Sequence, residues 1–431
     1  MRNDIPHASR TFVPPKLLFV HSGSTKKRLT FETAAAMGVE IYLLNATPSW
    51  ADAHARETVY APNASLDDIL SLTENLHRRV HLDGVVTFWE EDVPTCAHIA
   101  HHLGLPGNVP DKALNARSKY QMRDAFHRAG VPVPRFRLIT DETSLSNACR
   151  ELKLPAVLKP EWGADSEWVT RVDSVEQALN IYREIRNRAR VQDSLYPYPR
   201  ARFILEEFLY GPEVSVEGVV QNGQVTLYAI IDKAKMDPTS FIERGETTPS
   251  RFPLPVQEAI RDMVVRGATA LGLTHSGIHA EVKITPDGPR IVEIGARMGG
   301  DCIQPLVKRV YGINLAEENI RVVLGLQAHK PTPAKGWGIS TTLVPDRPGQ
   351  VRIKPIRYAR RNGKLIEIVF TKQDGDHVDV PPVAYDNLAW VSVWGKNYSS
   401  AKRSLDLHIH RVARAFDIKP EVRVAYGDVA D

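Results

Sequence analysis

Cysteine is scarce in this chain. Its three residues, Cys96, Cys149 and Cys302, are odd in number and irregularly spaced among 431 positions. They give neither a disulfide framework nor a zinc-binding pattern, and they suit a reducing compartment. The polar, proline-rich residues 1–15 do not resemble a secretory signal. We therefore expect a cytoplasmic protein.

Long hydrophobic runs and an excess of one charge are also missing. The longest apolar stretch near the N-terminus, 17–20, fits one short strand, whereas crossing a bilayer needs about 18–20 apolar residues. The 55 basic and 51 acidic residues are well mixed and leave a formal net charge of +4. We therefore expect no membrane and no nucleic acid as partner, but a small anionic ligand held at a few basic points. The oligomeric state stays open, with a homodimer as one alternative.

Residues 14–110 alternate short apolar stretches with helical patterns, which predicts a parallel sheet. The strands and helices are expected at 16–20, 29–38, 39–45, 66–79, 83–88 and 93–103. No G-x-G-x-x-G follows the first strand, so a dinucleotide-dependent oxidoreductase is disfavoured. An α/β scaffold domain is the favoured interpretation.

Residues 111–330 read as a second domain, with a small α/β lobe at about 136–205. A strand-rich region follows to about 295, interrupted by a helix at 256–271. The segment 330–338 reads as a linker. Residues 331–431 are expected to form a separate α+β lobe that ends in a basic helix near 399–415. The expected fold class is thus α/β and α+β, in three parts.

The segment HAEVKITPDGPRIVEIGAR (279–297) predicts a hairpin that faces two glutamates toward each other. Its turn, TPDGP, is typical of a three-residue loop with Thr285 opposite Pro289. Counting four residues outward on each strand places Glu281 opposite Glu293. Like charges at facing positions destabilise a sheet, which a hard divalent cation between them would resolve. The alternatives are two solvated glutamates, or glutamates neutralised by a nearby lysine or arginine.

Two further segments indicate a nucleotide site. AVLKP ends an apolar strand with Lys159, at a position where phosphate often binds, and a short loop around Ser166 follows it. FILEEFLYGPEVSVEG joins two strands through a connector that begins near Phe208, where exposed backbone amides can hold an adenine edge. An ordinary surface lysine and an ordinary interstrand turn remain the alternatives.

In this order and spacing, the features of about 111–326 resemble the ATP-grasp superfamily, whose three-lobed fold has an N-terminal α/β domain. The resemblance implies ATP as substrate and Mg²⁺, or Mn²⁺, as the metal. It assigns a phosphate role to Lys119 and Lys159, the adenine hinge to Glu206, Glu207, Phe208 and Leu209, and the ribose to Glu213. The loop residue Ser166 falls among the ATP contacts. Glu281 and Glu293 match the metal pair, and Arg297 matches the arginine that stabilises the acyl-transfer intermediate.

Three positions, in two segments, depart from the superfamily's pattern. Gly295 stands where an asparagine often supplies a further metal oxygen, which puts that metal contact in doubt. Asp165 and Trp168 stand where relatives often carry glycine, which puts the backbone contacts of this loop with phosphate in doubt.

Within the superfamily, THSGIHAEVKIT, EIGARMGGD and the tail beyond 330 are most similar to L-amino-acid ligases, which make dipeptides. This resemblance implies small amino-acid substrates, bound by the residues Glu243, Glu246, His279 and Asp301. The expected function is an ATP-dependent ligase that forms a peptide bond through an acyl phosphate and releases ADP and phosphate. A carboxylase or purine-pathway ligase of the same fold, or an inactive nucleotide-binding relative, are the alternatives.

Overall fold

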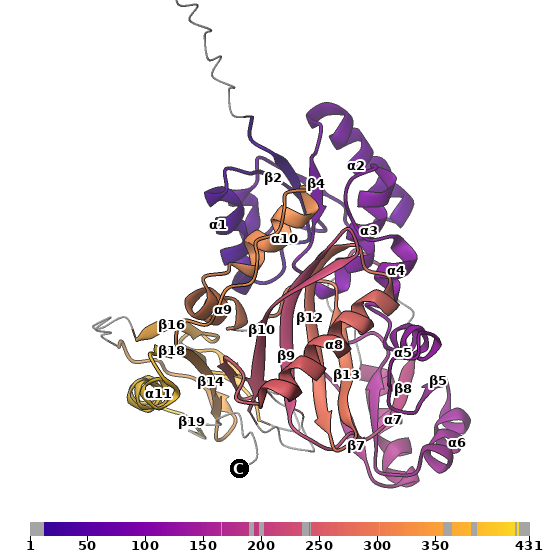
Figure 1. Cartoon of the computed structure of the whole chain (residues 1–431), viewed down its shortest axis with the longest axis vertical. Helices are drawn as coiled ribbons and strands as arrows, with labels where there is room; N and C mark the ends of the chain where they lie inside the picture. Colours follow the sequence, from indigo (N-terminus) through magenta and orange to yellow (C-terminus); the bar gives the residue numbers. More distant parts are fainter. Residues whose placement is uncertain are drawn as a thin grey trace, which may run out of the picture.

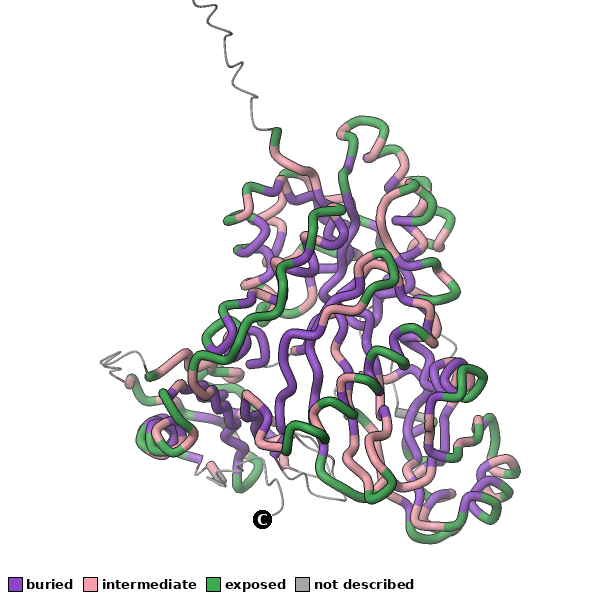
Figure 2. Tube along the Cα trace, viewed as in Figure 1, coloured by how far each residue is buried: buried purple, intermediate pink, exposed green. Residues whose placement is uncertain are grey.

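The computed structural model describes residues 13–164, 166–188, 194–197, 202–234, 241, 243–300, 302–356, 364–380, 386–418 and 420–421. A large central sheet carries the N-terminal domain at one end, a small lobe at the other, and the C-terminal strands along one edge (Figure 1). The inner strands of this sheet are buried along most of their length, the two edge strands are mostly half-buried, and the outer helices keep exposed faces (Figure 2).

The N-terminal domain is a four-stranded parallel sheet in the order β3-β2-β1-β4, as predicted. Its strands are β1 (Lys16–Val20), β2 (Glu40–Asn45), β3 (Glu57–Tyr60) and β4 (Gly84–Val86), and its helices are α1 (Arg28–Ala36), α2 (Leu66–Val80) and α3 (Val93–His102). The sequence did not predict β3, a half-exposed edge strand of only four residues without an apolar run. Because β1 has β2 on one side and β4 on the other, the carboxyl ends of β1 and β4 form the topological switch point where ligands of such sheets bind.

Two short helices lead into the small lobe, α4 (Pro110–Asn115) and α5 (Lys119–Arg128). The lobe is a four-stranded antiparallel sheet in the order β5-β8-β6-β7, packed against two helices. Its elements are β5 (Phe136–Ile139), α6 (Glu142–Leu152), β6 (Ala156–Pro160), β7 (Thr170–Val172), α7 (Val175–Arg188) and β8 (Phe203–Glu207). Between α7 and β8, residues 194–197 touch the N-terminal domain, where Leu195 enters the core under β1 and Asp92 accepts its backbone N–H at 2.9 Å.

The central sheet has the strand order β13-β12-β9-β10-β11-β14-β18-β16, with β19 paired to β14. Its strands are β9 (Glu213–Gln221), β10 (Gln224–Lys233), β11 (Gly245–Thr248), β12 (His275–Thr285), β13 (Gly288–Gly295), β14 (Trp337–Pro345), β16 (Leu365–Phe370), β18 (Ala389–Gly395) and β19 (Pro420–Glu421). A small separate ribbon pairs β15 (Gly349–Gln350) with β17 (His377–Val378). Helix α8 (Leu254–Leu271) covers one face, and α9 (Ile303–Tyr311) and α10 (Leu315–Val323) pack on the other with the N-terminal domain.

The C-terminal region has a hydrophobic cluster of its own, built around α11 (Tyr398–Ala413). Its strands β14, β18 and β16 nevertheless continue the central sheet through β11, so no break in the sheet coincides with the expected boundary at 330. The division of the chain into 14–110, 111–330 and 331–431 therefore stays a prediction based on sequence.

Candidate active site

The alternation of side chains along β9, β10, β12 and β13 creates the site. In β12, Ile278, Ala280 and Val282 point into the apolar layer under α8. Because successive side chains in a strand point to opposite faces, His279 and Glu281 emerge on the other face. The same alternation in the neighbouring strands brings their polar residues to this face, namely Glu213 and Glu217 of β9, Lys233 of β10 and Glu293 of β13.

The register of the β12–β13 hairpin confirms that Glu281 lies opposite Glu293. The predicted route to this pairing is wrong in one detail. Thr285 pairs with Gly288 rather than Pro289, because Gly288 adopts a positive φ of 101° and closes a two-residue loop. A β-bulge at Val292 then adds one residue to β13 and restores the facing pair.

Each of the facing glutamates has a lysine partner. Neutralisation by a nearby lysine or arginine was one of the alternatives that the sequence left open. Lys233 lies 2.5 Å from Glu281, and Lys119 lies 3.2 Å from Glu293. Burial raises the pKa of Glu281, but Lys233 and His279 more than offset this and hold it well below its usual range. The side chains of Glu281 and Glu293 remain 26% and 21% exposed, so both carboxylates can still meet a ligand.

Lys233 is the centre of the charge network, and sequence reasoning missed it. Its buried ammonium lies 2.5 Å from Glu281, 3.1 Å from Glu213 and 3.3 Å from Glu243. Burial lowers the pKa of Lys233, yet these carboxylates raise it well above its ordinary value, so the lysine stays charged. One lysine thus joins three carboxylates to which the resemblance assigns metal, ribose and amino-acid roles.

His279 lies beside the Glu281–Glu293 pair, and it is held by a carboxylate that sequence reasoning also missed. Its Nδ1 is 2.5 Å from fully buried Glu217, and its Nε2 is 3.8 Å from Glu281. Burial lowers the pKa of His279, but Glu217 raises it to about 10. Glu217 also accepts the backbone N–H of Gly299 at 2.9 Å, where an added Cβ would lie 2.8 Å from the Glu217 carboxylate. The pair therefore anchors the loop after β13 to the strand that carries Glu281.

The two predicted phosphate lysines are both buried at the junction of the small lobe and the central sheet. Lys119, at the start of α5, donates to the carbonyl of Gly163 at 2.8 Å and so contacts the loop after β6. Lys159, at the end of β6, lies 2.6 Å from Glu206. Burial lowers the pKa of Lys159, and Glu206 acts against this effect.

Arg123 of α5 connects the small lobe to the β12–β13 hairpin. Its guanidinium is buried, with Nε 2.7 Å from Glu206 and an N–H donated at 2.5 Å to the carbonyl of Val292, the bulge residue. Burial raises the pKa of Glu206, but Arg123 and Lys159 lower it below its usual range. The Glu206 side chain is therefore committed to an internal ion pair.

The four residues of the predicted adenine hinge fall into two groups at the end of β8, two inside the strand and two after it. Glu206 and Glu207 still pair with β6, so the first backbone groups outside the ladder belong to Phe208 and Leu209. The Phe208 ring has the Arg171 guanidinium 4.9 Å from its centroid and Phe241 at 6.4 Å. An aromatic ring with a stacked cation offers a flat surface that suits a planar base.

The remaining predicted substrate residues lie at different depths. Glu243 is about a quarter exposed beside Lys233, whereas Glu246 lies buried in β11 and accepts the Ser340 hydroxyl at 2.9 Å. Ser166 is exposed in the loop after β6, with a positive φ of 56°. Asp301 and Asp165 lie outside the described residues.

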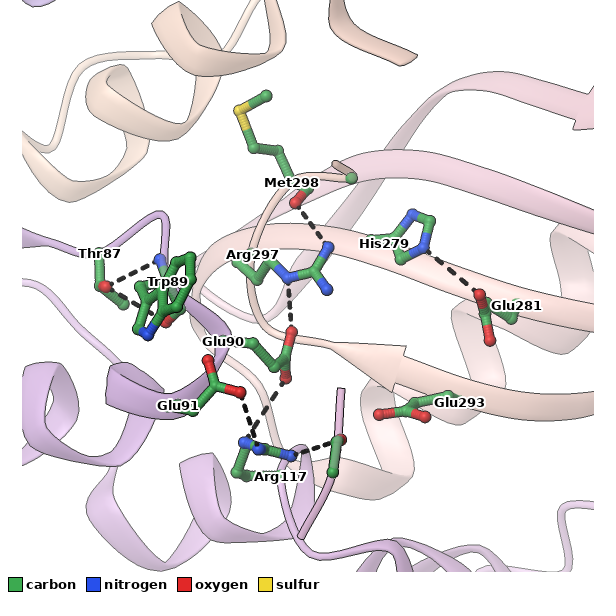
Figure 3. A network of polar contacts seen from close by, with 12 residues as sticks. Thr87, Trp89, Glu90, Glu91, Arg117, His279, Glu281, Glu293, Arg297 and Met298 are labelled. Carbon is green, nitrogen blue, oxygen red and sulfur yellow. Dashed lines mark hydrogen bonds and ion pairs between the residues drawn. The ribbon is translucent and has the colours of Figure 1, made fainter. Parts of the chain in front are cut away.

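Arg297 is held by the N-terminal domain (Figure 3). Its Nε lies 2.5 Å from Glu90, which belongs to the 3-10 helix Glu90–Asp92 after β4, and its NH1 donates to the carbonyl of Met298 at 2.9 Å. Glu90 also lies 4.0 Å from Arg117, and Glu91 lies 3.6 Å from Arg117. Burial raises the pKa of Glu90, but Arg297 and Arg117 lower it below its usual range, so this carboxylate is ionised.

The residues on this face fit a hard divalent cation bound together with a nucleotide. Two facing, partly exposed carboxylates are the oxygen ligands that Mg²⁺ prefers. The lysines that now neutralise them could turn to phosphate oxygens when a cation takes over the carboxylates. Clusters of lysine and metal around phosphates are typical of phosphoryl-transfer sites.

The fold and these residues define a protein of the ATP-grasp class, and comparison with known proteins agrees. Residues 152–305 match the ATP-grasp domain family, and residues 31–107 match the ATP-grasp N-terminal domain family. Together the two matches cover more than half of the chain, which belongs to the ATP-grasp superfamily.

Amino-acid ligases are among the relatives. The chain is 29% identical over 249 residues to alanine–anticapsin ligase of Bacillus subtilis (strain 168), covering 54% of this chain and 52% of that protein. It is 25% identical over 342 residues to carnosine synthase 1 of Homo sapiens, covering 75% of this chain and 41% of that protein. The matched part thus spans about half the length of these relatives, or less.

A solved structure supports the fold over nearly the whole chain. The crystal structure of an L-amino acid ligase from Bacillus licheniformis superposes with a TM-score of 0.77 at 19% identity, covering 94% of this chain and 98% of that one. Among the helices of the described residues, none combines the length and apolar character that crossing a bilayer requires.

Proposed function

We propose that this protein is an ATP- and Mg²⁺-dependent ligase that joins two amino acids by a peptide bond and releases ADP and phosphate. The observation that carries the proposal is the polar face of the central sheet, which bears the Glu281–Glu293 pair and Lys233. Lys119 contacts Glu293 there, and Lys159 is linked to the same hairpin through Glu206 and Arg123. The similarity to proteins named alanine–anticapsin ligase and carnosine synthase 1 supports the choice of amino acids as substrates.

In the first step, a substrate carboxylate oxygen attacks the γ-phosphorus of ATP, and ADP leaves. Mg²⁺ held by Glu281 and Glu293 would neutralise the phosphate charge, which favours such a transfer. Lys119 and Lys159 hold phosphate oxygens, and Lys233 moves from its carboxylates toward the transferred group. The product of this step is an acyl phosphate.

In the second step, the amine of the other amino acid attacks the acyl carbon, and phosphate leaves with the former carboxylate oxygen. Arg297 stabilises the oxyanion that develops on the acyl group. Glu243 receives the ammonium of the amino acid whose carboxylate is activated. The loop after β6 would exclude water, because water would otherwise hydrolyse the acyl phosphate.

A pairwise screen tests this proposal. The purified protein is incubated with ATP, Mg²⁺ and amino acids two at a time, and released ADP, AMP and phosphate are measured together with product masses. The proposal predicts ADP and phosphate in equal amounts with a dipeptide mass. ADP release that depends instead on bicarbonate or a phosphoribosyl amine would move the protein to another branch of the superfamily, and AMP release would contradict the mechanism.

A further inference from the structure

Glu90 reaches the polar face of the central sheet from the N-terminal domain. It follows the β4 strand at the switch point of the parallel sheet, and it is buried with 6% of its surface exposed. A buried carboxylate is costly unless it is paired, and Glu90 is paired with Arg297 at 2.5 Å. The contact therefore crosses between two domains at the residue proposed to stabilise the acyl-transfer oxyanion.

Gly295 makes room for this carboxylate. A Cβ at position 295 would lie 3.0 Å from Oε2 of Glu90 and 3.6 Å from Oε1. Ile294 points into the apolar layer under α8, so positions 293 and 295 share the opposite face. The space that a side chain at 295 would fill, two residues beyond Glu293, is thus filled by Glu90.

The pairing also fixes the orientation of the arginine. A guanidinium is planar, so two separate anchor points define its direction. In Arg297 these are Nε, bound to Glu90, and NH1, bound to the carbonyl of Met298. Figure 3 shows the guanidinium between Glu90 and the strand that carries Glu281.

We propose that Glu90 is the positioning residue for Arg297, and that Gly295 is required because Glu90 occupies the space of its absent side chain. This inference rests on the proposed function, since it assigns Glu90 to the acyl-transfer step. Glu90 touches no reacting atom in this role. It makes the geometry of Arg297 depend on how the N-terminal domain docks against the central sheet.

The first test compares two neighbouring carboxylates. Glu90→Gln keeps the shape but weakens the bond to Arg297, and Glu91→Gln is the matched control, because Glu91 is joined to Arg117 in Figure 3. Glu90→Gln should lower kcat for dipeptide formation about tenfold, within the range for a misplaced catalytic group. It should also raise the ratio of phosphate to dipeptide, while the affinity for MgATP, measured by calorimetry, stays within about twofold.

The Glu91→Gln control should leave kcat close to the wild-type value and the ratio of phosphate to dipeptide unchanged, because Glu91 pairs with Arg117. A ratio shift is the informative readout, because a variant that only loses stability makes less of both products in the same proportion. Equal effects of the two substitutions would overturn the proposal.

The second test is a double-mutant cycle between positions 90 and 295. Gly295→Asn alone should displace Glu90 and lower kcat for dipeptide formation as much as Glu90→Ala does. In the Glu90→Ala background, Gly295→Asn should cause little further loss, because the space is already empty. Losses that simply add would overturn the shared-space argument.

Wild-type protein without amino-acid-dependent ADP release would instead refute the proposed function. The failure of this inference and the failure of the proposed function are therefore distinguishable.

Discussion

Replacing Lys233 with glutamine would test the charge network at its centre. The substitution removes a positive charge that the three carboxylates Glu213, Glu243 and Glu281 share, at 2.5–3.3 Å from its nitrogen. Breaking a buried ion pair by removing one partner costs about 3–5 kcal/mol. Because Glu243 and Glu281 are about a quarter exposed, we expect the lower part of this range, about 3 kcal/mol.

The sign of the pH dependence follows from the same contacts. Without Lys233 the carboxylates repel one another, and protonation relieves the repulsion, so the loss of stability should shrink as the pH falls toward 4–5. Mg²⁺ should also restore part of the stability by binding to the folded form alone. Thermal unfolding between pH 4 and pH 8, with and without Mg²⁺, measures both effects.

Lys283→Gln is the matched control for this substitution. Lys283 lies on β12, contacts the same Glu213 at 3.4 Å and is partly exposed. A partly exposed pair contributes about 1 kcal/mol or less, so this variant should unfold close to the wild type. If both variants lose the same stability, or if the Lys233→Gln loss does not depend on pH, then Lys233 is not the shared counter-ion that we describe.

Three further predictions follow from single contacts. Lys159→Ala should weaken ATP binding by about 1.5–3 kcal/mol, the range of a charge-assisted hydrogen bond, and unchanged affinity in calorimetry would refute its phosphate role. Glu243→Ala should raise the KM for the N-terminal amino acid far more than the KM for ATP, measured by steady-state kinetics with each substrate varied in turn. An equal rise of both KM values would contradict this role of Glu243. Burial raises the pKa of Asp92 to about 7. The unfolded chain ionises this carboxyl at lower pH than the folded protein does, so Asp92 should lower the free energy of unfolding as the pH rises from about 4 through 7. Asp92→Asn should therefore stabilise the protein at pH 8 by a few kcal/mol at most and much less at pH 5, and equal unfolding shifts at the two values would contradict this.

The residues that the sequence placed correctly share a local signal. The facing of Glu281 and Glu293 depends only on a turn and on alternation within one hairpin, and both are readable from a short segment. Even there, the loop length was wrong by one residue. The pairing survived because the bulge at Val292 compensates, and its carbonyl is satisfied by Arg123 from a distant helix.

The residues that sequence reasoning missed depend on contacts between distant segments. Lys233 is the last residue of the apolar strand β10, and Lys159 is the next-to-last residue of β6, so the same signal could have found Lys233. Glu90 follows the parallel strand β4 in a run of three acids, at a strand end where ligands often bind. Nothing in its own segment, however, indicates that it meets Arg297, because that contact forms only when the N-terminal domain packs against the central sheet.

The continuity of the central sheet could not be predicted from the sequence for a similar reason. The proline-rich segment near 330–338 predicted a linker to a separate lobe. Local composition marks a break in regular structure, but it does not say which edge the next strand joins. In the structure β14 pairs with β11 directly, and the sheet continues.

The most direct measurement of the central claim follows one oxygen atom. An amino acid labelled with ¹⁸O in its carboxylate is incubated with ATP, Mg²⁺, a second amino acid and the enzyme, and the released phosphate is analysed by mass. If the carboxylate is activated as an acyl phosphate, one ¹⁸O moves into each phosphate released with ADP, and the transfer disappears in Glu281→Gln and Glu293→Gln. Unlabelled phosphate, label recovered in AMP, or full transfer in either variant would contradict the account.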